Sequence, residues 1–533
     1  MTRRAKRGVA VLLALAAMPA LYLTYALAQR QAARPRRAEA ASGAQKTITV
    51  KAGDNLQRAL DAARPGDEVV LEAGATFVGN FVLPPKPGET FITVRSSRAG
   101  ELAEGRRVTP ADSARMARVA TPNSSPALLA PPNAHHWRLV GLDVTQSGSF
   151  NTYDLIQLGD GDTSGPQDAA EKAPHHLRLE RCFIHAFDAR TPLKRGVALN
   201  SAHTEIVDSH VSGAKVEGQD AQAVAGWAGP GPFLIENNYL EASGENLIFG
   251  GAVPAARGLI PSDIVIRRNL FRKPLEWKQG DPSFAGTAWT VKNLFELKSA
   301  RRVTVEANVF ENNWAHAQSG FAIVLTVENG SGAWAQVEDV TFANNLVRNS
   351  TNAFNIRARD VDPGSGLRRV TIRNNLFERI EGMFIQLLRG GENLTVEHNT
   401  VLHGGSVLAF DWAAEGEYST GLRFADNVVS HNLYGVIGAG GAIGTAALER
   451  FTRRWTFAGN VVAGADPARY PAGNLYPQVL DPKYFADAAR GNYRIVYPRL
   501  KGRATDGKDP GCDFDELEEA LAWYLRPPAA APR

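Results

Sequence analysis

The sequence predicts an all-β protein, a right-handed parallel β-helix of about eleven coils with a short helix at each end. A unit of alternating apolar residues, an asparagine and an apolar pair recurs along the chain, as in VTFANNLV (340–347), VTIRNNLF (370–377) and LTVEHNTV (394–401). Alternation with a period of two is typical of β-strands, and self-similarity at a period of roughly 20–50 residues is typical of repeat architectures.

The spacing of the repeated asparagines indicates the size of one coil. Asn345, Asn375, Asn399, Asn427 and Asn460 are separated by 30, 24, 28 and 33 residues, which fits three short strands with loops of varying length. Asparagine tolerates the left-handed backbone of a sharp turn, and stacked side-chain amides can bond to one another. We therefore expect a structural ladder of Asn238, Asn269, Asn308, Asn345, Asn375, Asn399, Asn427 and Asn460.

Both ends of such a β-helix need covers, because they expose unpaired strand edges. Residues 54–57 (Asp-Asn-Leu-Gln) are typical of a helix start, and Leu56, Ala59, Leu60 and Ala63 share one face of the predicted helix. An amphipathic helix is predicted from Asp513 to about Arg526, and we expect it to act as a lid. The predicted coils span residues 46–465, and residues 466–533 form the C-terminal capping segment.

The N-terminus has the pattern of an export signal. Basic residues precede an apolar stretch from Val9 to Ala28, which ends in a small-residue cleavage motif. The stretch also nearly reaches the length that spans a bilayer, so residues 1–28 are either a cleaved signal peptide or a retained anchor. Residues 29–45 are expected to be a disordered spacer. Either way, the body is expected to be secreted, periplasmic or attached to the cell envelope.

The charge distribution argues against a nucleic-acid partner. The formal net charge is +4, but residues 1–37 contain eight basic residues and no acidic ones, so the remaining chain carries about −4. A mildly acidic body does not attract a polyanion by bulk electrostatics. Membrane contact is expected only through the N-terminal segment, and the protein is expected to be a monomer.

The two cysteines, Cys182 and Cys512, exclude a disulfide framework. Cys182 takes the place of the repeated asparagine in its coil, which favours a buried structural thiol. A bond between the two would require the C-terminal tail to fold back, and the sequence leaves that possibility open.

The outer face of the first strand in each coil is a candidate for a polar groove. In residues 295–298 (Phe-Glu-Leu-Lys) the apolar side chains are expected to point inward, which leaves Glu296 and Lys298 together on the outside. The outward polar candidates on neighbouring first strands are Asn200, Gln222, Asn246, Asn355, Arg357 and Gln386. Such a groove suits a chain-like sugar. The alternative is an ordinary solvated face on which the Glu–Lys pair contributes little.

An insertion at 276–293 precedes this strand and contains Trp277, Phe284 and Trp289. Aromatic rings exposed on a loop suit stacking against a sugar, because a pyranose face carries apolar C–H groups. The alternative is that the loop packs these rings onto the wall of the coil.

A second polar concentration lies in residues 218–227 and 241–251. Asp220, Glu241 and Glu245 are spaced so that two carboxylates could face each other across adjacent coils. A glycoside hydrolase needs such a pair, one as acid and one as base or nucleophile. Carboxylates are also common on any exposed turn.

The opening segment QRALDAARPGDEVVLEAG (57–74), followed by the asparagine-bearing coils, resembles the pectate-lyase-like superfamily of right-handed β-helices. Within it, bacterial right-handed parallel β-helix repeat proteins are the most similar, over roughly residues 46–500. The resemblance implies the fold and a polysaccharide-related function, but a fold does not identify a substrate.

Residues 293–299 locally resemble the group of chondroitinase B and the alginate lyases. That resemblance implies Ca²⁺ bound by Glu296, with Asn293, to neutralise a uronate. It also implies Lys298 as the base that removes the C5 proton, assisted by an arginine from the next coil. The sequence departs from the pattern in two ways. The next first strand, FAIVLTV, has no arginine, so that Arg357 is the nearest, and no second acidic ligand precedes Glu296.

Three functional hypotheses follow. The first is an exported lyase that cleaves an acidic, uronate-containing polysaccharide by β-elimination. The second is a glycoside hydrolase with paired carboxylates, among which Glu245 is the main catalytic candidate. The third is a non-catalytic, glycan-binding protein of the cell envelope.

Overall fold

The computed structural model describes residues 45–328, 330, 332–360, 366–411 and 417–526. The described residues from Thr47 onward form one compact unit. The expected targeting segment, residues 1–28, lies outside the described residues, as does the expected spacer 29–45 apart from its last residue. Among the helices of the described ranges, none is long and apolar enough to cross a membrane.

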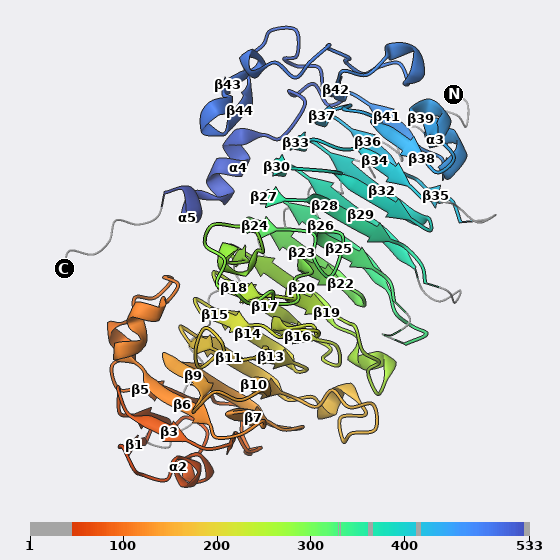
Figure 1. The fold of residues 1–533 in the computed structure, drawn as a ribbon. Helices are drawn as coiled ribbons and strands as arrows, with labels where there is room; N and C mark the ends of the chain where they lie inside the picture. Colours follow the sequence, from red (N-terminus) through yellow and green to blue (C-terminus); the bar gives the residue numbers. More distant parts are fainter. Residues whose placement is uncertain (1–44, 329, 331, 361–365, 412–416, 527–533) are drawn as a thin grey trace, which may run out of the picture. The chain divides into compact units, whose positions relative to one another are not determined.

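Three long sheets of stacked, parallel strands build this unit (Figure 1). Sheet A consists of β1 (Thr47–Val50), β2 (Glu68–Leu71), β5 (Ile92–Ser96), β8 (His135–Val140), β11 (His175–Glu180), β14 (Ala202–Val207), β17 (Phe233–Glu236), β20 (Ser262–Arg267), β23 (Ala300–Glu306), β26 (Val337–Ala343), β29 (Leu367–Arg373), β32 (Gly391–Glu397), β35 (Ser419–Thr420), β36 (Arg423–Ala425), β40 (Thr452–Arg453) and β41 (Thr456–Ala458).

Sheet B consists of β3 (Thr76–Val78), β6 (Ala117–Thr121), β9 (Leu142–Gln146), β12 (Phe183–His185), β15 (His210–Ala214), β18 (Tyr239–Ala242), β21 (Leu270–Arg272), β24 (Val309–Asn313), β27 (Leu346–Ser350), β30 (Leu376–Ile380), β33 (Thr400–His403), β37 (Val428–Ser430) and β42 (Val461–Ala463).

Sheet C consists of β4 (Phe81–Val82), β7 (Leu128–Ala130), β10 (Thr152–Leu158), β13 (Leu193–Leu199), β16 (Gln222–Gly226), β19 (Glu245–Phe249), β22 (Asn293–Leu297), β25 (Phe321–Thr326), β28 (Asn352–Arg357), β31 (Ile385–Leu388), β34 (Leu408–Phe410), β38 (Val436–Gly438) and the antiparallel β39 (Ala442–Ile443).

One coil passes through sheets C, A and B in that order, as β22, β23 and β24 do, so the right-handed parallel β-helix is confirmed. Among the described residues sheet B has 13 strands, more than the eleven coils predicted. The two further strands, β3 and β6, belong to the first coils, whose sequence does not show the repeated unit.

The asparagine ladder lies at the turn between sheets A and B. Asn308 Nδ2 donates to Asn345 Oδ1 over 3.1 Å, and Asn345 Nδ2 donates to Asn375 Oδ1 over 3.1 Å. All eight predicted ladder residues are buried. Asn474 extends the ladder beyond Asn460, with its Oδ1 2.9 Å from Asn460 Nδ2. The ladder therefore satisfies the buried polar groups of each sharp turn with the next coil.

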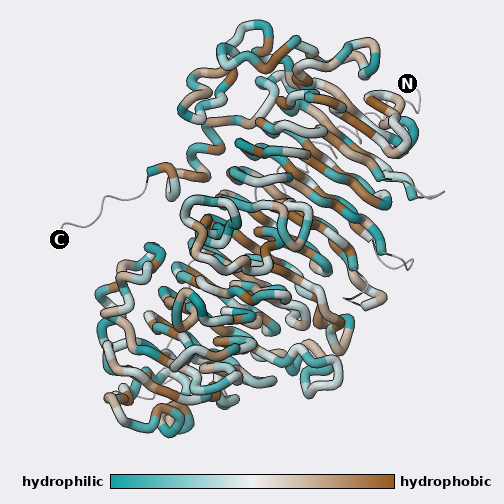
Figure 2. The backbone as a smooth tube through the Cα atoms, in the orientation of Figure 1, coloured by the Kyte–Doolittle hydropathy of each residue, from teal (hydrophilic) through white to brown (hydrophobic). Residues whose placement is uncertain are grey.

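Apolar side chains fill the interior between the three sheets. Phe271, Phe310 and Phe342 form an aromatic column, with ring centroids 4.4 Å and 5.5 Å apart. Hydrophobic residues recur at matching places on successive strands in Figure 2. The apolar residues of each alternating segment thus point inward, and the polar residues between them point to the outer faces.

Short helices cover the two ends of this core. Helix α2 (Leu56–Ala62) begins at Asn55, whose side chain accepts from the Arg58 backbone N–H, and its predicted apolar face is buried. At the other end α3 (Thr445–Phe451) buries Ala447, Leu448 and Phe451 against the core. The ring of Phe451 stacks on Phe410 of β34 at 5.6 Å. Helix α3 was not predicted from the sequence.

The C-terminal helices α4 (Phe514–Ala520) and α5 (Ala522–Leu525) lie in a different place from the expected lid. Phe514, Leu517 and Leu521 pack on the outer face of sheet B, against apolar side chains of β24, β27 and β30. A short hairpin of β43 (Phe485–Asp487) and β44 (Asn492–Ile495) precedes them. The tail therefore folds back along the coils. It covers Val309, Leu346 and Leu376, the apolar residues on the outer face of sheet B.

Replacing Leu517 with alanine is expected to loosen this tail selectively. Leu517 is 2% exposed, and truncation of a buried leucine costs about 2–5 kcal/mol. Hydrogen exchange should therefore rise in residues 513–526 and in the outer positions of β24 and β27, with the inner core unchanged. Leu525→Ala is the matched control, because Leu525 is exposed. Equal exchange in both variants would contradict the docking of α4.

The two cysteines are free and buried. Cys182 occupies the ladder position, where its backbone N–H donates to Ser209 Oγ. Cys512 lies in the returning tail, where its N–H donates to Thr400 Oγ1. The tail does fold back, but it reaches the coil of Thr400 rather than that of Cys182.

Candidate active site on sheet C

The outer face of sheet C brings acidic and basic side chains together around β22. Phe295 and Leu297 belong to the core, so Glu296 and Lys298 share the outer face as strand alternation predicts. Glu296 is level with Val324 and Asn355 on the next two strands. Gln222, Glu245 and Asn293 form a second level across β16, β19 and β22.

Lys298 lies between two carboxylates. Its Nζ is 2.6 Å from Glu328 Oε2 and 3.9 Å from Glu296 Oε1. Burial alone would lower the pKa of Lys298, but the charges of Glu296 and Glu328 outweigh burial and raise it above the usual range. Glu328 directly follows the strand FAIVLTV and was not among the residues predicted from the sequence. It supplies a second carboxylate beside Lys298, from the coil after Glu296.

Glu296 is almost fully buried. Its Oε2 accepts from Asn293 Nδ2 over 3.0 Å. Burial, and next the charge of Glu245, raise the pKa of Glu296 to about 7. A carboxyl group with this pKa exchanges its proton near neutral pH, which is a property of catalytic acids and bases.

This shift makes a prediction about stability. Between about pH 4.5 and about 7, Glu296 keeps its proton in the folded protein but loses it in the unfolded chain. The free energy of unfolding therefore falls as pH rises through that window. Glu296→Gln removes the effect. Relative to the wild type, the variant is expected to gain stability from about pH 5 to about pH 8 in urea titrations.

The exposed Glu449, replaced by glutamine, serves as the control and is expected to show no such trend. A difference between Glu296→Gln and the wild type that stays constant with pH would contradict the raised pKa.

Three buried oxygens on neighbouring strands find no hydrogen-bond donor among the described residues. They are Gln222 Oε1, Glu245 Oε1 and Asn293 Oδ1, all at the same level of sheet C. The other carboxylate oxygen of Glu245 accepts from Gln222 Nε2 over 2.8 Å. A buried acceptor without a donor costs about 1–3 kcal/mol, so a cluster of three indicates a place prepared for a ligand.

A second lysine stands beside this cluster. Lys292 Nζ lies 2.5 Å from Asp220 Oδ2 and 3.6 Å from Glu245 Oε1. Burial opposes the charge of Lys292, but Glu245 and Asp220 raise its pKa overall. Asp220 and Glu245 therefore do meet across adjacent coils, with an ammonium group between them.

Glu241, the third carboxylate of the predicted hydrolase group, lies elsewhere. It belongs to β18 of sheet B, where it accepts from the Tyr239 hydroxyl over 2.7 Å and from the Gly213 N–H over 3.0 Å. Burial raises its pKa. Of the three predicted carboxylates, Glu241 therefore does not join Asp220 and Glu245, because the turn after β18 leaves it on sheet B rather than sheet C.

The strand register relates Arg357 to Lys298. Leu297 pairs with Leu325, so Lys298 lies opposite Thr326, and Thr326 pairs with Arg357. Lys298 and Arg357 are thus level, with one strand between them and about 9–10 Å between their backbones. Arg357 pairs with Asp360 over 2.5 Å. Next to it, Asn355 Nδ2 donates to Gln386 Oε1 over 2.8 Å, and both residues are half-buried. These three predicted residues do share the outer face with Lys298.

Asn246 does not reach the groove. It is fully buried, and its amide donates to the backbone carbonyls of Leu240 and Arg272 and accepts from Lys273. The prediction of a substrate contact was wrong, because the turn into sheet C directs this side chain inward. Burial lowers the pKa of Lys273 to about 7, and three backbone carbonyls accept from its Nζ.

The aromatic insertion packs on the protein rather than on solvent. Trp277 and Trp289 are 8% and 7% exposed and cluster with Val291 and with Trp314 from the following coil. Their prediction as sugar-stacking rings was wrong, and the alternative that the loop packs onto the coil wall is correct for them. Phe284 remains half-buried.

Comparison with known proteins identifies the fold. No protein-family description matches the sequence, and no curated protein matches it. A PL6-family alginate lyase, AlyGC, superposes with a TM-score of 0.51 at 15% identity, over 91% of this chain and 59% of that enzyme. The protein has the fold of the pectate-lyase-like β-helices.

Two further structures align with this β-helix at lower scores. An alginate lyase from Paenibacillus sp. strain FPU-7 gives a TM-score of 0.38 at 17% identity, over 81% of this chain and 98% of that one. A pectate lyase gives 0.36 at 11% identity, over 88% and 96% of the two chains. At these identities the likenesses concern the fold alone.

A cavity of about 270 Å³ on the same face of the β-helix was not predicted. Arg195 of β13 pairs with Asp154 over 2.5 Å and lies 4.9 Å from the centroid of the Trp227 ring, and all three line the cavity. Arg195 is level with Gln222, so the cavity lies in line with the Glu245 level. The polar face of sheet C thus extends from β10 to β31.

Proposed function

We propose that the protein is an exported enzyme that cleaves a uronate-containing polysaccharide by β-elimination on the outer face of sheet C. One observation carries the proposal: buried Glu296 lies 3.9 Å from Lys298, on a face where oxygens of Gln222, Glu245 and Asn293 have no hydrogen-bond donor among the described residues. Buried ionisable groups with shifted pKa values are costly to stability and gather at functional sites. The fold shared with AlyGC agrees with this proposal.

The residues divide the reaction between them. Elimination removes the proton at C5 of the uronate, and the electrons of that C–H bond form a C4–C5 double bond. The glycosidic oxygen leaves C4 with the electrons of its bond and takes up a proton to become a hydroxyl. Lys298 Nζ is the base in this proposal. Its pKa is high because of Glu296 and Glu328, so a ligand that engages Glu296 lowers the pKa of Lys298. Arg357, on the same level, stabilises the negative charge that develops.

The donor set fits a hard cation such as Ca²⁺. Calcium prefers six to eight oxygen ligands, and Gln222, Glu245 and Asn293 offer buried oxygens without donors, with the carboxylate of Glu296 beside them. Bound there, Ca²⁺ would neutralise the uronate carboxylate and so acidify its C5 proton. Lys292, 3.6 Å from Glu245, offers a positive charge of the protein's own for the same task.

The test is incubation with alginate, polygalacturonate, chondroitin and heparin, with and without Ca²⁺, while the ultraviolet absorbance of unsaturated ends is followed. Absorbance is expected to rise with at least one polymer. Cleavage without unsaturated ends would contradict elimination. Binding without any cleavage would leave the non-catalytic glycan binder as the function.

A hydrolase is the second candidate, favoured by the raised pKa of Glu296. A carboxyl group with a pKa of about 7 can donate a proton at neutral pH while Glu245 serves as the base. This mechanism predicts new reducing ends without ultraviolet absorbance. It also predicts that turnover falls as the pH rises above about 7, because Glu296 then loses the proton it must donate.

A further inference from the structure

Five histidines gather on the outer face of sheet A, away from the residues of sheet C discussed above. His135 and His136 begin β8, His175 and His176 begin β11, and His203 lies in β14. His135 and His175 are level partners in the sheet. The chain has 11 histidines, so nearly half of them lie on three adjacent strands.

A local backbone feature places both members of each pair on the same face. In a regular strand two consecutive side chains point to opposite faces. His136 has φ 57° and His176 has φ 53°, in the left-handed region, and this interrupts the alternation. As a result Nδ1 of His135 lies 2.9 Å from Nδ1 of His136, and the matching distance from His175 to His176 is 2.7 Å.

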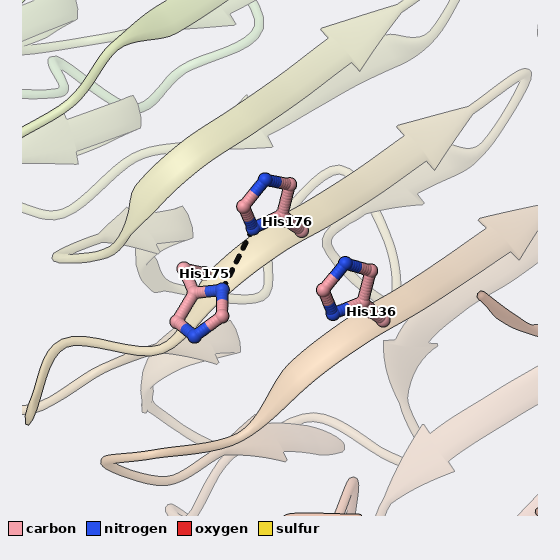
Figure 3. A group of neighbouring side chains, drawn as sticks. All are labelled: His136, His175 and His176. Atoms are coloured by element: carbon pink, nitrogen blue, oxygen red, sulfur yellow. Dashed lines mark hydrogen bonds between the residues drawn. The ribbon is translucent and has the colours of Figure 1, made fainter. Parts of the chain in front are cut away.

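The rings of one strand lie over those of the next. His136 stacks on His176 with centroids 4.6 Å apart and 4° between the planes, and His135 stacks on His175 at 4.9 Å and 3°. One ring nitrogen from each of His136, His175 and His176 lies within 4.8 Å of the other two. Figure 3 shows His136 on one strand facing the His175–His176 pair on its neighbour.

The rings border a cavity of about 470 Å³, which Gly88 and Glu89 also line. Neutral imidazole is the form that binds metal ions.

Later coils use the same left-handed position differently. Asp263 and Arg302, which also have positive φ, form an ion pair over 2.6 Å, as do Asp339 and Arg369. In the later coils this position thus brings opposite charges together on neighbouring strands. In the earlier coils it brings histidine rings together instead. The hydrogen bond between His175 and His176 and the stacking of His136 on His176 hold the three rings, and their nitrogens converge beside a cavity.

We propose that His136, His175 and His176 bind a divalent transition-metal ion of the Zn²⁺ class. Imidazole nitrogen is a preferred ligand of Zn²⁺ at about 2.0–2.1 Å, which places tetrahedral ligand atoms about 3.3 Å apart. The three nitrogens therefore need only small side-chain rotations to close around an ion. Glu89, at the border of the cavity, or water completes the coordination. The ion would tie β8 to β11 and lies outside the proposed lyase site.

The test uses the full exported chain without a polyhistidine tag, freed of metal and titrated with Zn²⁺ by calorimetry. One ion per chain is expected. His136→Asn and His176→Asn are expected to weaken binding by at least about tenfold each. Asparagine tolerates positive φ, so these variants keep the backbone. His203→Asn is the matched control, because His203 stacks on His176 at 4.5 Å but is not one of the three converging residues.

Two further readouts are independent of any enzyme activity. Co²⁺ is expected to show the visible absorption of a nitrogen-ligated ion, and excess Zn²⁺ is expected to raise the Tm of the wild type but not of His136→Asn. No Zn²⁺ binding would overturn the proposal. So would equal losses in His203→Asn and His136→Asn, which would indicate scattered surface binding.

Discussion

Replacing Lys298 with alanine is expected to abolish the formation of unsaturated sugar ends. The proposed base is then missing, and general-base catalysis contributes about 10²–10⁴ in rate. Lys298→Arg is expected to be equally inactive, because arginine keeps the charge but does not give up its proton. Initial rates of absorbance increase on the preferred uronate polymer measure the effect.

Lys501→Ala is the control for this experiment, because Lys501 is an exposed lysine of the C-terminal segment. It is expected to retain wild-type rates. Activity that survives in Lys298→Ala would show that another group removes the proton. Activity retained in Lys298→Arg alone would show that Lys298 serves only as a positive charge.

Replacing Asn375 with alanine is expected to cause a large loss of stability. Its Oδ1 accepts from the backbone N–H and the side-chain amide of Asn345. Its Nδ2 donates to Phe342 O, Arg373 O and Asn399 Oδ1. The substitution leaves several buried groups unpaired, and a loss of about 3–4 kcal/mol is expected.

Urea unfolding followed by circular dichroism measures this loss. Asn151→Ala is the control, because Asn151 is exposed in the loop before β10. Since the coils contact only their neighbours, the transition is expected to broaden without unfolding of every coil. Hydrogen exchange should locate the loss at β29 to β32. A loss below about 1 kcal/mol would contradict a structural role for the ladder.

The coils could be predicted because each one repeats a local requirement. The ladder needs a buried amide in each coil and the core needs alternation, so both requirements recur in the sequence. The expected left-handed conformation of the ladder asparagine was wrong, because the residue before it, such as Ala307 or Asn344, adopts the positive φ. The same alternation places Glu296 and Lys298 outward. Features that depend on the residues of a single strand could therefore be predicted from the sequence.

Residues from different coils could not be matched in the same way. Glu328 reaches Lys298, and Lys292 reaches Glu245, only because of the register between strands and the lengths of the loops. The burial of Trp277 and Trp289 depends on Trp314, which belongs to the next coil.

The histidine cluster had a sequence signal, the two His-His pairs at 135–136 and 175–176, that the sequence analysis did not use. The pairs are 40 residues apart, more than the coil lengths read from the asparagines. Only the strand register shows that they are level.

The mass of the products tests the proposed chemistry most directly. A defined uronate oligosaccharide is incubated with the protein, and the two fragments of each cleavage are weighed by mass spectrometry. β-Elimination predicts fragments that together weigh the same as the substrate, one of them carrying a double bond. Fragments that together weigh one water molecule more than the substrate would show hydrolysis and contradict the proposed lyase.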